Sequence, residues 1–277
     1  MITQEKAVGK PFLRWAGGKR WLTSQIETII PKDFNNYFEP FLGGASIYIY
    51  LKKKNLIKNT SFLSDANADL INAYNMIAKD HQKVIDILKQ YKNEKEQYYI
   101  LRDLEPQTDI EKAARFIYLN KTSYNGIYRV NRNGKYNVPY GDRKIINLFD
   151  FENIENISKI LNKETTLISH DFELIKESIQ ASDLIFLDPP YTVAHENNGF
   201  VEYNQSIFTW DDQKRLANLL QHINEVGAFF IMTNAKHDSI DELFSPYGEH
   251  SILSRQSLIG GKGAKRQNIN EYIFKNF

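Results

Sequence analysis

The chain of 277 residues contains no cysteine, so disulfides, thiolate metal sites and cysteine nucleophiles are all excluded. It also lacks any apolar run near the roughly 20 residues that span a bilayer. Its N-terminus, MITQEKAVGK, has no apolar signal core. We therefore expect a cytoplasmic protein that makes no contact with a membrane.

A strong charge imbalance is missing too, since 35 Lys and Arg residues against 34 Asp and Glu residues leave a net charge of +1. Basic residues nevertheless gather in two segments. The first holds Arg115, Lys121, Arg129, Arg132, Lys135, Arg143 and Lys144, and the second holds Arg255, Lys262, Lys265 and Arg266. A basic face on a near-neutral protein is typical of a surface that follows phosphates, although scattered charge on a solvated loop is the alternative for each cluster.

Strand-like and helical segments alternate along much of the chain. Strands are expected at 37–39, 61–64, 166–169, 183–187 and 228–233, and helices at 46–54, 68–78, 173–180 and 211–226. This alternation predicts an α/β fold with a mostly parallel, doubly wound sheet. Residues 251–253 and 271–274 are expected to form an antiparallel edge pair.

The alternation breaks between about 80 and 155, where helical patterns at 81–104 and 112–121 precede a hairpin over 128–137. Asn133-Gly134 is a strong signal for a two-residue turn in that hairpin. We expect an α/β domain at 1–67 and 152–277, and an inserted, mostly helical domain at 68–151 that serves recognition.

The most informative segment is Asp188-Pro189-Pro190-Tyr191, which follows the apolar run 184–187. The run predicts a buried strand, and this places Asp188 at a carboxyl end, where open α/β sheets bind ligands. The prolines fix the backbone, so the Asp188 carboxylate and the Pro189 carbonyl become rigid acceptors. With the Tyr191 ring they suit an exocyclic amino group on a planar base. The alternative is an N-capping aspartate before a Pro-Pro turn.

Other polar motifs follow earlier strands. The segment 39–46 (EPFLGGAS) joins a strand to a helix, and its glycines let the backbone turn tightly and approach a ligand closely. Asp65 ends the second strand, where an acid commonly accepts hydrogen bonds from a ribose, although it can also cap the next helix. Near the N-terminus, a core position for Trp15 and a surface position for Lys19 are the simplest interpretation of those two residues by themselves.

Taken in order, these segments resemble the DNA adenine methyltransferase (Dam) family of N6-adenine methyltransferases. The resemblance rests on 12–20 (FLRWAGGKR), 38–46 (FEPFLGGAS), Asp65, the polar and aromatic block 116–141, and 186–191 (FLDPPY). It extends from about residue 10 to residue 274. It implies a Rossmann-like S-adenosylmethionine-dependent fold of the alpha (D12) class, from a bacterium, an archaeon or a phage.

The resemblance also implies roles for individual residues. The residues expected near the cofactor are Trp15, Ala16, Gly18, Lys19, Glu39, Pro40, Phe41, Gly43, Ser46, Asp65, Asn67, Asp171 and Phe172. Among these, Lys19 would pair with the methionine carboxylate, Asp65 would hold the ribose, and Asp171 and Phe172 would receive the adenine, although Asp171 can also cap the next helix. Ala45 stands where the family often has glycine.

The block 116–141 is implied to be the target-recognition module. Its expected DNA contacts are Asn120, Tyr124, Asn125, Arg129, Asn131, Arg132 and Lys135, since such side chains suit base edges and phosphates. Tyr118, Tyr128 and Tyr136 have packing as the alternative. Loops at 197–210 and 255–267 are further expected DNA contacts. No metal site is indicated, because His195 and His237 lack metal-ligand companions.

The implied reaction moves a methyl group from S-adenosylmethionine to N6 of a flipped adenine in duplex DNA, with S-adenosylhomocysteine as the product. Asp188 and the Pro189 carbonyl would accept hydrogen bonds from the amino hydrogens, while Tyr191 would stack on the base. Methylation of carbon 5 of cytosine is excluded, because it needs a thiolate. GATC is an expected target. We expect a monomer that serves restriction-modification, with a cognate endonuclease as functional partner, or DNA regulation.

Three alternatives stay open. N4-cytosine methylation uses nearly the same pocket, although enzymes of that kind favour Ser where this chain has Asp188. RNA or protein amides can also be methylated beside a Pro-Pro-Tyr turn, but the basic insertion argues against a protein substrate. A DNA-binding paralogue without activity is the third, and Asp188, Asp65 and Lys19 argue against it because a pure binder has no chemical need for them.

Overall fold

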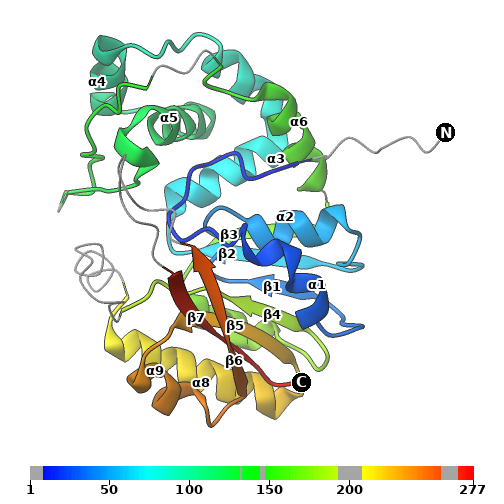
Figure 1. Ribbon diagram of the computed structural model, residues 1–277. Helices are drawn as coiled ribbons and strands as arrows, with labels where there is room; N and C mark the ends of the chain where they lie inside the picture. Colours follow the sequence, from blue (N-terminus) through cyan, green and yellow to red (C-terminus); the bar gives the residue numbers. More distant parts are fainter. Residues whose placement is uncertain (1–8, 132, 144–146, 162, 193–207, 257–267) are drawn as a thin grey trace. The chain divides into compact units, whose positions relative to one another are not determined.

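One seven-stranded sheet runs through the part of the chain that the structure describes. The structure is a computed structural model, and the described residues are 9–131, 133–143, 147–161, 163–192, 208–256 and 268–277 (Figure 1). Neighbouring strands are hydrogen-bonded in the order β3-β2-β1-β4-β5-β7-β6. The strands are β1 (Tyr37–Glu39), β2 (Ser61–Asp65), β3 (Thr165–Ser169), β4 (Leu184–Leu187), β5 (Phe229–Ala235), β6 (Glu249–Gln256) and β7 (Asn268–Lys275).

Most of this sheet is parallel. β1 pairs in parallel with β2 and with β4, and β4 pairs in parallel with β5. β7 is antiparallel to both β5 and β6. The predicted α/β fold with a mostly parallel sheet is confirmed, and so is the antiparallel pair, in which Ser251 lies opposite Ile273.

The helices lie between the strands where crossovers require them. The α-helices are α1 (Ile26–Ile29), α2 (Ser46–Lys53), α3 (Ala68–Leu88), α4 (Lys95–Asp103), α5 (Asp109–Thr122), α6 (Phe151–Ile160), α8 (Trp210–Val226) and α9 (Asp238–Phe244). The 3₁₀ turns are η1 (Leu22–Ser24), η2 (Tyr124–Gly126) and η3 (Phe172–Ser178). No helix within the described ranges is long and apolar enough to cross a membrane.

The helical pattern at 81–104 is confirmed: it is the end of α3, which bends at Asp80 (φ −156°), followed by the separate helix α4. One helical prediction needs correction. The helix expected at 173–180 is the 3₁₀ turn η3, whose buried side chains Phe172 and Ile175 are three residues apart. That spacing matches the period of a 3₁₀ helix, in which side chains at i and i+3 share one side.

The chain divides into two compact units. The first unit comprises the described residues up to Thr23 together with Leu42–Ile57 and Ser64–His170, and the second comprises Ser24–Phe41, Lys58–Leu63 and Asp171–Phe277. The predicted recognition domain, 68–151, lies entirely within the first unit. Its boundaries as a separate domain stay a prediction.

In the first unit, α3 and α5 pack side by side (Figure 1). α3 begins at the N-cap Asn67, whose side chain accepts a hydrogen bond from the Leu70 N–H, and α5 begins with a capping box between Thr108 and Glu111. Buried residues of α3 such as Leu70, Tyr74 and Ile77 recur every three or four positions, which places them on one face of the helix.

In the second unit, α8 and α9 cover one face of the sheet (Figure 1). Leu216, Leu219, Leu220 and Ile223 of α8 form an apolar stripe at helical spacing, and they pack with buried residues of β4, β5 and β7. Fully burying an aliphatic side chain contributes about 1.5–3 kcal/mol, so this core holds β4 and β5 firmly. α8 ends at Gly227, which adopts the left-handed conformation (φ +75°) that favours glycine.

The hairpin predicted over 128–137 is confirmed as an antiparallel bridge between Val130 and Tyr136, next to which the Asn137 N–H donates to the Arg129 carbonyl at 3.1 Å. The Asn131 N–H donates to the Lys135 carbonyl at 2.8 Å, so the turn is longer than the two-residue turn expected. Gly134 supplies the left-handed residue (φ +72°) that the turn needs.

Candidate active site

The buried strand β4 carries Asp188 to the carboxyl end of the sheet in the second unit. Leu187 is paired with Met232 of β5, so the residues that follow them, Asp188 and Thr233, lie next to each other. The Thr233 hydroxyl donates to Asp188 Oδ1 at 2.7 Å. No helix begins within 189–192. The N-cap interpretation of Asp188 is therefore wrong, and the prediction of a buried strand before it is confirmed.

Tyr191 is held by a carboxylate from β7. Its hydroxyl donates to Glu271 Oε2 at 2.8 Å, and Glu271 is fully buried. Burial of the phenol, followed by the nearby carboxylates of Glu271 and Asp188, raises the pKa of Tyr191 well above its usual value. Tyr191 is therefore a neutral hydrogen-bond donor across the physiological pH range.

The chain after the Pro-Pro pair is tied to α8. Thr192 accepts a hydrogen bond from the Gln213 side chain at 3.1 Å, and Gln213 in turn accepts one from Asn234 of β5 at 3.1 Å. All three side chains are buried. Buried amide and hydroxyl groups are costly unless they are hydrogen-bonded, so this chain of contacts favours one conformation of the segment that follows Tyr191.

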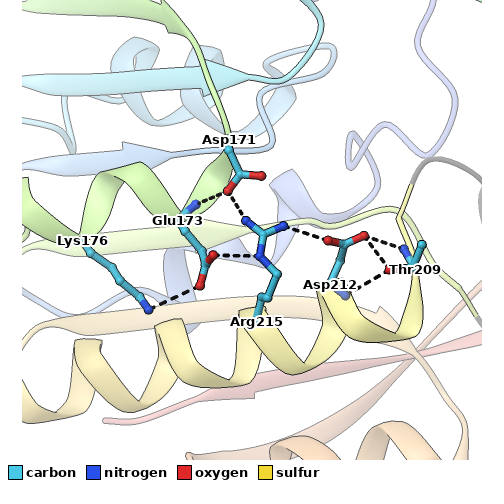
Figure 2. A network of polar contacts seen from close by, with 6 residues as sticks. All are labelled: Asp171, Glu173, Lys176, Thr209, Asp212 and Arg215. Carbon is cyan, nitrogen blue, oxygen red and sulfur yellow. Dashed lines mark hydrogen bonds and ion pairs between the residues drawn. The ribbon is translucent and has the colours of Figure 1, made fainter.

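A second polar network surrounds Asp171 (Figure 2). Asp171 caps η3 by accepting from the Glu173 N–H at 3.0 Å. Arg215 of α8 donates to Asp171 at 2.6 Å, to Glu173 at 2.7 Å and to Asp212 at 2.8 Å. Its partial burial lowers the pKa, but the three carboxylates outweigh burial and raise the pKa of Arg215 above its usual value. The guanidinium is therefore permanently charged and fixed in direction.

The same guanidinium lies over the Phe172 ring, 4.8 Å from its centroid. Phe172 also contacts Phe41, with ring centroids 5.2 Å apart, and Phe208, at 5.6 Å. Nearby in sequence, Pro40 and Glu39 are buried, and Glu39 accepts a hydrogen bond from the Tyr37 hydroxyl at 2.7 Å. The second unit thus brings together the predicted Phe41, Asp171 and Phe172.

In the first unit, Asp65 at the end of β2 holds the turn that leads into α2. Its carboxylate accepts the Gly43 N–H at 3.0 Å and the Asn67 N–H at 2.9 Å. Burial raises the pKa of Asp65, and these two hydrogen bonds act against that rise. The cap of α3 is Asn67, so the alternative role of Asp65 as the helix cap is wrong.

The turn before α2 contains two residues in the left-handed conformation. Gly43 has φ +46°, and Ala45, where the family often has glycine, is also left-handed at φ +54°. A non-glycine residue there costs about 1–2 kcal/mol. A Cβ on Gly43 would lie 2.8 Å from Cδ1 of Trp15, so the glycine is required by the indole.

The N-terminal motif packs around this turn. Trp15 is half-buried and stacks with Tyr128 at 6.0 Å between ring centroids. Lys19 is buried, only 4% exposed, and donates to the Gly17 carbonyl at 3.0 Å, so its interpretation as a surface charge is wrong. Ser46 is buried at the start of α2, while Ala16 and Gly18 are exposed. The roles of these residues toward a cofactor stay predictions.

The residues predicted to contact DNA differ in exposure. Tyr124, Asn125, Arg129, Asn131 and Lys135 are exposed. Asn120 is buried, and its amide bonds both backbone groups of Arg14, at 2.8 Å and 2.7 Å. We therefore leave Asn120 out of the DNA contacts proposed below. Arg132 lies outside the described residues.

The tyrosines of this block have packing roles. Tyr118 and Tyr136 are buried, which confirms packing for these two. Tyr128 is half-buried and donates to Asp69 at 3.0 Å.

The first basic cluster is less exposed than the sequence suggests. Arg115 donates to the carbonyls of Leu101 and Arg102, and Arg143 donates to Ser123 at 3.2 Å. Burial lowers the pKa of Lys121, and the charges of Arg14 and Lys10 add to that effect. Among the described members of this cluster, the exposed cations are therefore Arg129 and Lys135.

The other residues of the two basic clusters and of the predicted DNA-contacting loops lie mostly outside the described residues. Lys144, Lys262, Lys265 and Arg266 lie outside the described residues, as do positions 197–207 of the predicted loop at 197–210 and all but the first two residues of the predicted loop at 255–267.

Three functional side chains were missed by sequence reasoning: Thr233, Glu271 and Arg215. Each acts on a motif residue that is 44 to 80 positions away. Glu271 did leave a signal. It lies two positions from Ile269 and two from Ile273, so the three residues belong to one face of the last strand. An acid on an otherwise apolar face predicts a buried partner.

Comparison with known proteins identifies the family. A family model of the D12 class N6 adenine-specific DNA methyltransferases matches residues 15–258. The chain is 35% identical to the type II methyltransferase M.MjaIII of Methanocaldococcus jannaschii, over 97% of this chain and 99% of that protein. It is 32% identical to the type II methyltransferase M1.LlaDCHI of Lactococcus lactis, over 100% and 99%, and 28% identical to a DNA adenine methylase of Vibrio cholerae, over 95% of each.

The chain therefore belongs to the D12 class of N6 adenine-specific DNA methyltransferases, enzymes that methylate adenine in DNA. The family predicted from the ordered motifs is confirmed.

Proposed function

We propose that this methyltransferase takes its methyl group from S-adenosylmethionine and places it on N6 of an adenine flipped out of duplex DNA. The observation that carries the proposal is the Asp188 carboxylate, fixed by Thr233 at the carboxyl end of β4 and followed by the Pro-Pro-Tyr turn. A rigid acceptor with an aromatic ring close by in sequence suits an amino group on a planar base.

The residues present fit this methyl donor. Lys19 is a buried cation and suits a carboxylate, and Asp65 is a half-buried carboxylate, a group whose oxygens accept hydrogen bonds from donors such as ribose hydroxyls. Phe172 and Asp171 offer an aromatic ring and an acceptor for an adenine, and Arg215 holds both side chains in place. S-adenosylmethionine supplies an electrophilic methyl group on a sulfonium.

The side chains of the catalytic turn then act on the target base. Asp188 and the Pro189 carbonyl accept hydrogen bonds from the two amino N–H groups, which draws the nitrogen toward tetrahedral geometry and frees its lone pair from the ring; one of the two protons leaves when the methyl group is added. The Tyr191 ring stacks on the adenine, and Pro190 keeps the turn rigid. Catalysis by this site rests on positioning and electrostatics, with no covalent intermediate on the protein.

Replacement of Asp188 by alanine tests this proposal. The variant should lose about a hundredfold to a thousandfold in turnover, because removing one preorganised electrostatic group costs on that scale. Transfer of a labelled methyl group to DNA measures turnover, and calorimetry with S-adenosylmethionine should give a dissociation constant within about threefold of wild type. Near-normal turnover would remove Asp188 from the mechanism.

For the DNA partner, we propose contacts from the exposed Tyr124, Asn125, Arg129, Asn131 and Lys135, since Arg and Asn suit base edges and Lys suits phosphates. GATC is the proposed target. The product is digested with an enzyme that cuts only methylated GATC, and uncut product would reject this target while leaving adenine methylation standing.

The type II names of two relatives support a role in restriction-modification, with an endonuclease that recognises the same site as the functional partner. We propose that the enzyme acts as a monomer in the cytoplasm.

A further inference from the structure

Glu271 is a buried carboxylate that belongs to none of the motifs that carry the family resemblance. It lies in β7 with no exposed surface. A carboxylate removed from water is costly unless a hydrogen-bond donor compensates it. The Tyr191 hydroxyl is such a donor, at 2.8 Å from Oε2, and it comes from the catalytic turn 80 positions earlier in the chain.

The register of the sheet explains how Glu271 reaches this turn. Glu271 lies opposite Ala235 of β5, and Thr233 is two positions before Ala235. Because side chains alternate along a strand, Thr233 and Glu271 point to the same face of the sheet. On that face, the Thr233 hydroxyl donates to Asp188 and also contacts the Tyr191 hydroxyl, while Glu271 accepts from Tyr191, so β5 and β7 both hold the catalytic turn.

We infer that Glu271 is a positioning residue for methyl transfer, which fixes the plane of the Tyr191 ring through its hydroxyl. The inference rests on the proposed function, in which that ring stacks on the flipped adenine. A tyrosine ring turns about two side-chain bonds, and a hydrogen bond at its far end restrains both. The stacked base is then presented in one orientation, and misplacement of about 1 Å can cost a hundredfold in rate.

The chemistry of the pair favours a carboxylate over other acceptors. The Tyr191 hydroxyl donates to Glu271 Oε2 at 2.8 Å, and a carboxylate oxygen is a stronger acceptor than a neutral amide oxygen. Glutamine offers a weaker acceptor of the same shape, and leucine offers none.

A double-mutant cycle tests the inference, with Glu271→Gln, Glu271→Leu, Tyr191→Phe and the two combined pairs. The single-turnover rate of adenine methylation is measured at saturating S-adenosylmethionine and DNA. We expect Glu271→Leu and Tyr191→Phe each to lower the rate about tenfold, and Glu271→Gln to lower it about threefold. In the Tyr191→Phe background, either change at Glu271 should lower the rate less than twofold further, because both act through one contact.

Two further readouts separate positioning from a loss of structure. The dissociation constant for S-adenosylmethionine should stay within about twofold in all variants. The fluorescence of 2-aminopurine at the target position should show that the base still flips but is less well stacked. Glu249→Gln serves as the matched control, because Glu249 lies on the exposed end of the neighbouring strand β6.

The outcomes are separable. Rate losses that multiply in the double variants, or an unchanged rate in Glu271→Leu, would overturn the role of Glu271 while leaving the proposed function intact. A wild-type protein that leaves adenine unmethylated would overturn the proposed function itself, and with it this role.

Discussion

The catalytic turn after β4 and the glycine turn before α2 each follow a parallel strand of the sheet, but they are held in different ways. The catalytic turn, 188–192, is held by side chains from other elements: Thr233 and Glu271 from the sheet and Gln213 from α8. The glycine turn, 42–46, is held through its backbone, with Asp65 on the Gly43 N–H and two left-handed residues.

The difference fits what each turn has to do. A site that binds an amino group needs acceptor side chains with fixed rotamers, so each acceptor has a dedicated partner. A turn that meets a ligand closely needs a fixed backbone path, for which left-handed residues and a carboxylate on the N–H are suited. The two regions should therefore respond differently to substitution, and four predictions test this.

The largest effect is expected from Gly43→Ala. The new Cβ would lie 2.8 Å from Trp15 at a φ of +46°, so clash and backbone strain combine. We expect the free energy of unfolding to fall by about 3 kcal/mol, measured by chemical denaturation. Gly134→Ala is the control, because its φ is +72° but nothing lies within 4 Å of the added Cβ. It should lose only about 1 kcal/mol, and equal losses would show that strain alone matters.

The next effect is expected from Thr233→Val, which keeps the shape of the side chain but removes the donor to Asp188. The methylation rate should fall about thirtyfold, equivalent to about 2 kcal/mol, because the carboxylate loses its fixed direction. Stability should change much less than in Gly43→Ala. A rate loss below about twofold would mean that the catalytic turn does not depend on this side chain.

A smaller effect is expected from Arg215→Leu. The variant frees Asp171 and uncovers Phe172, and we expect about fivefold weaker binding of S-adenosylmethionine, measured by calorimetry. Lys214→Met is the matched control, since Lys214 pairs only with the exposed Asp211 among the ion pairs described for it. Equal binding of S-adenosylmethionine by both variants would show that the network of Figure 2 does not contribute to cofactor binding.

The smallest effect is expected from Thr209→Ala. Thr209 begins α8 by accepting the Asp212 N–H, and Asp212 bonds the Thr209 N–H in return. Loss of the cap should cost about 1 kcal/mol of stability, read from the thermal midpoint, with little change in rate. A large loss of rate would show that the start of α8 contributes to the site beyond its role as a helix cap.

Sequence reasoning predicted much of this molecule because its main signals are local. The apolar run before Asp188, the glycines of the turn at 39–46 and the alternation of strand-like with helical segments are each visible within a few residues. The alternation predicted the mostly parallel sheet, and the apolar run predicted the placement of Asp188.

The remaining features depend on register and packing. The contact of Tyr191 with Glu271 spans 80 positions and that of Asp188 with Thr233 spans 45, and both require β4, β5 and β7 to be aligned residue by residue. Burial of Lys19 and Asn120 and half-burial of Arg115 likewise follow from tertiary packing, which the polarity of a side chain does not reveal. Charge counts therefore overstated the exposure of the first basic cluster among its described members.

The most direct test of the account is the identity of the methylated nucleoside. The protein is incubated with S-adenosylmethionine and unmethylated duplex DNA, and the digested product is analysed by mass spectrometry. The account predicts N6-methyldeoxyadenosine in wild type and none above background in Asp188→Ala. N4-methyldeoxycytidine, or no methylated nucleoside from a protein that still binds DNA, would contradict it.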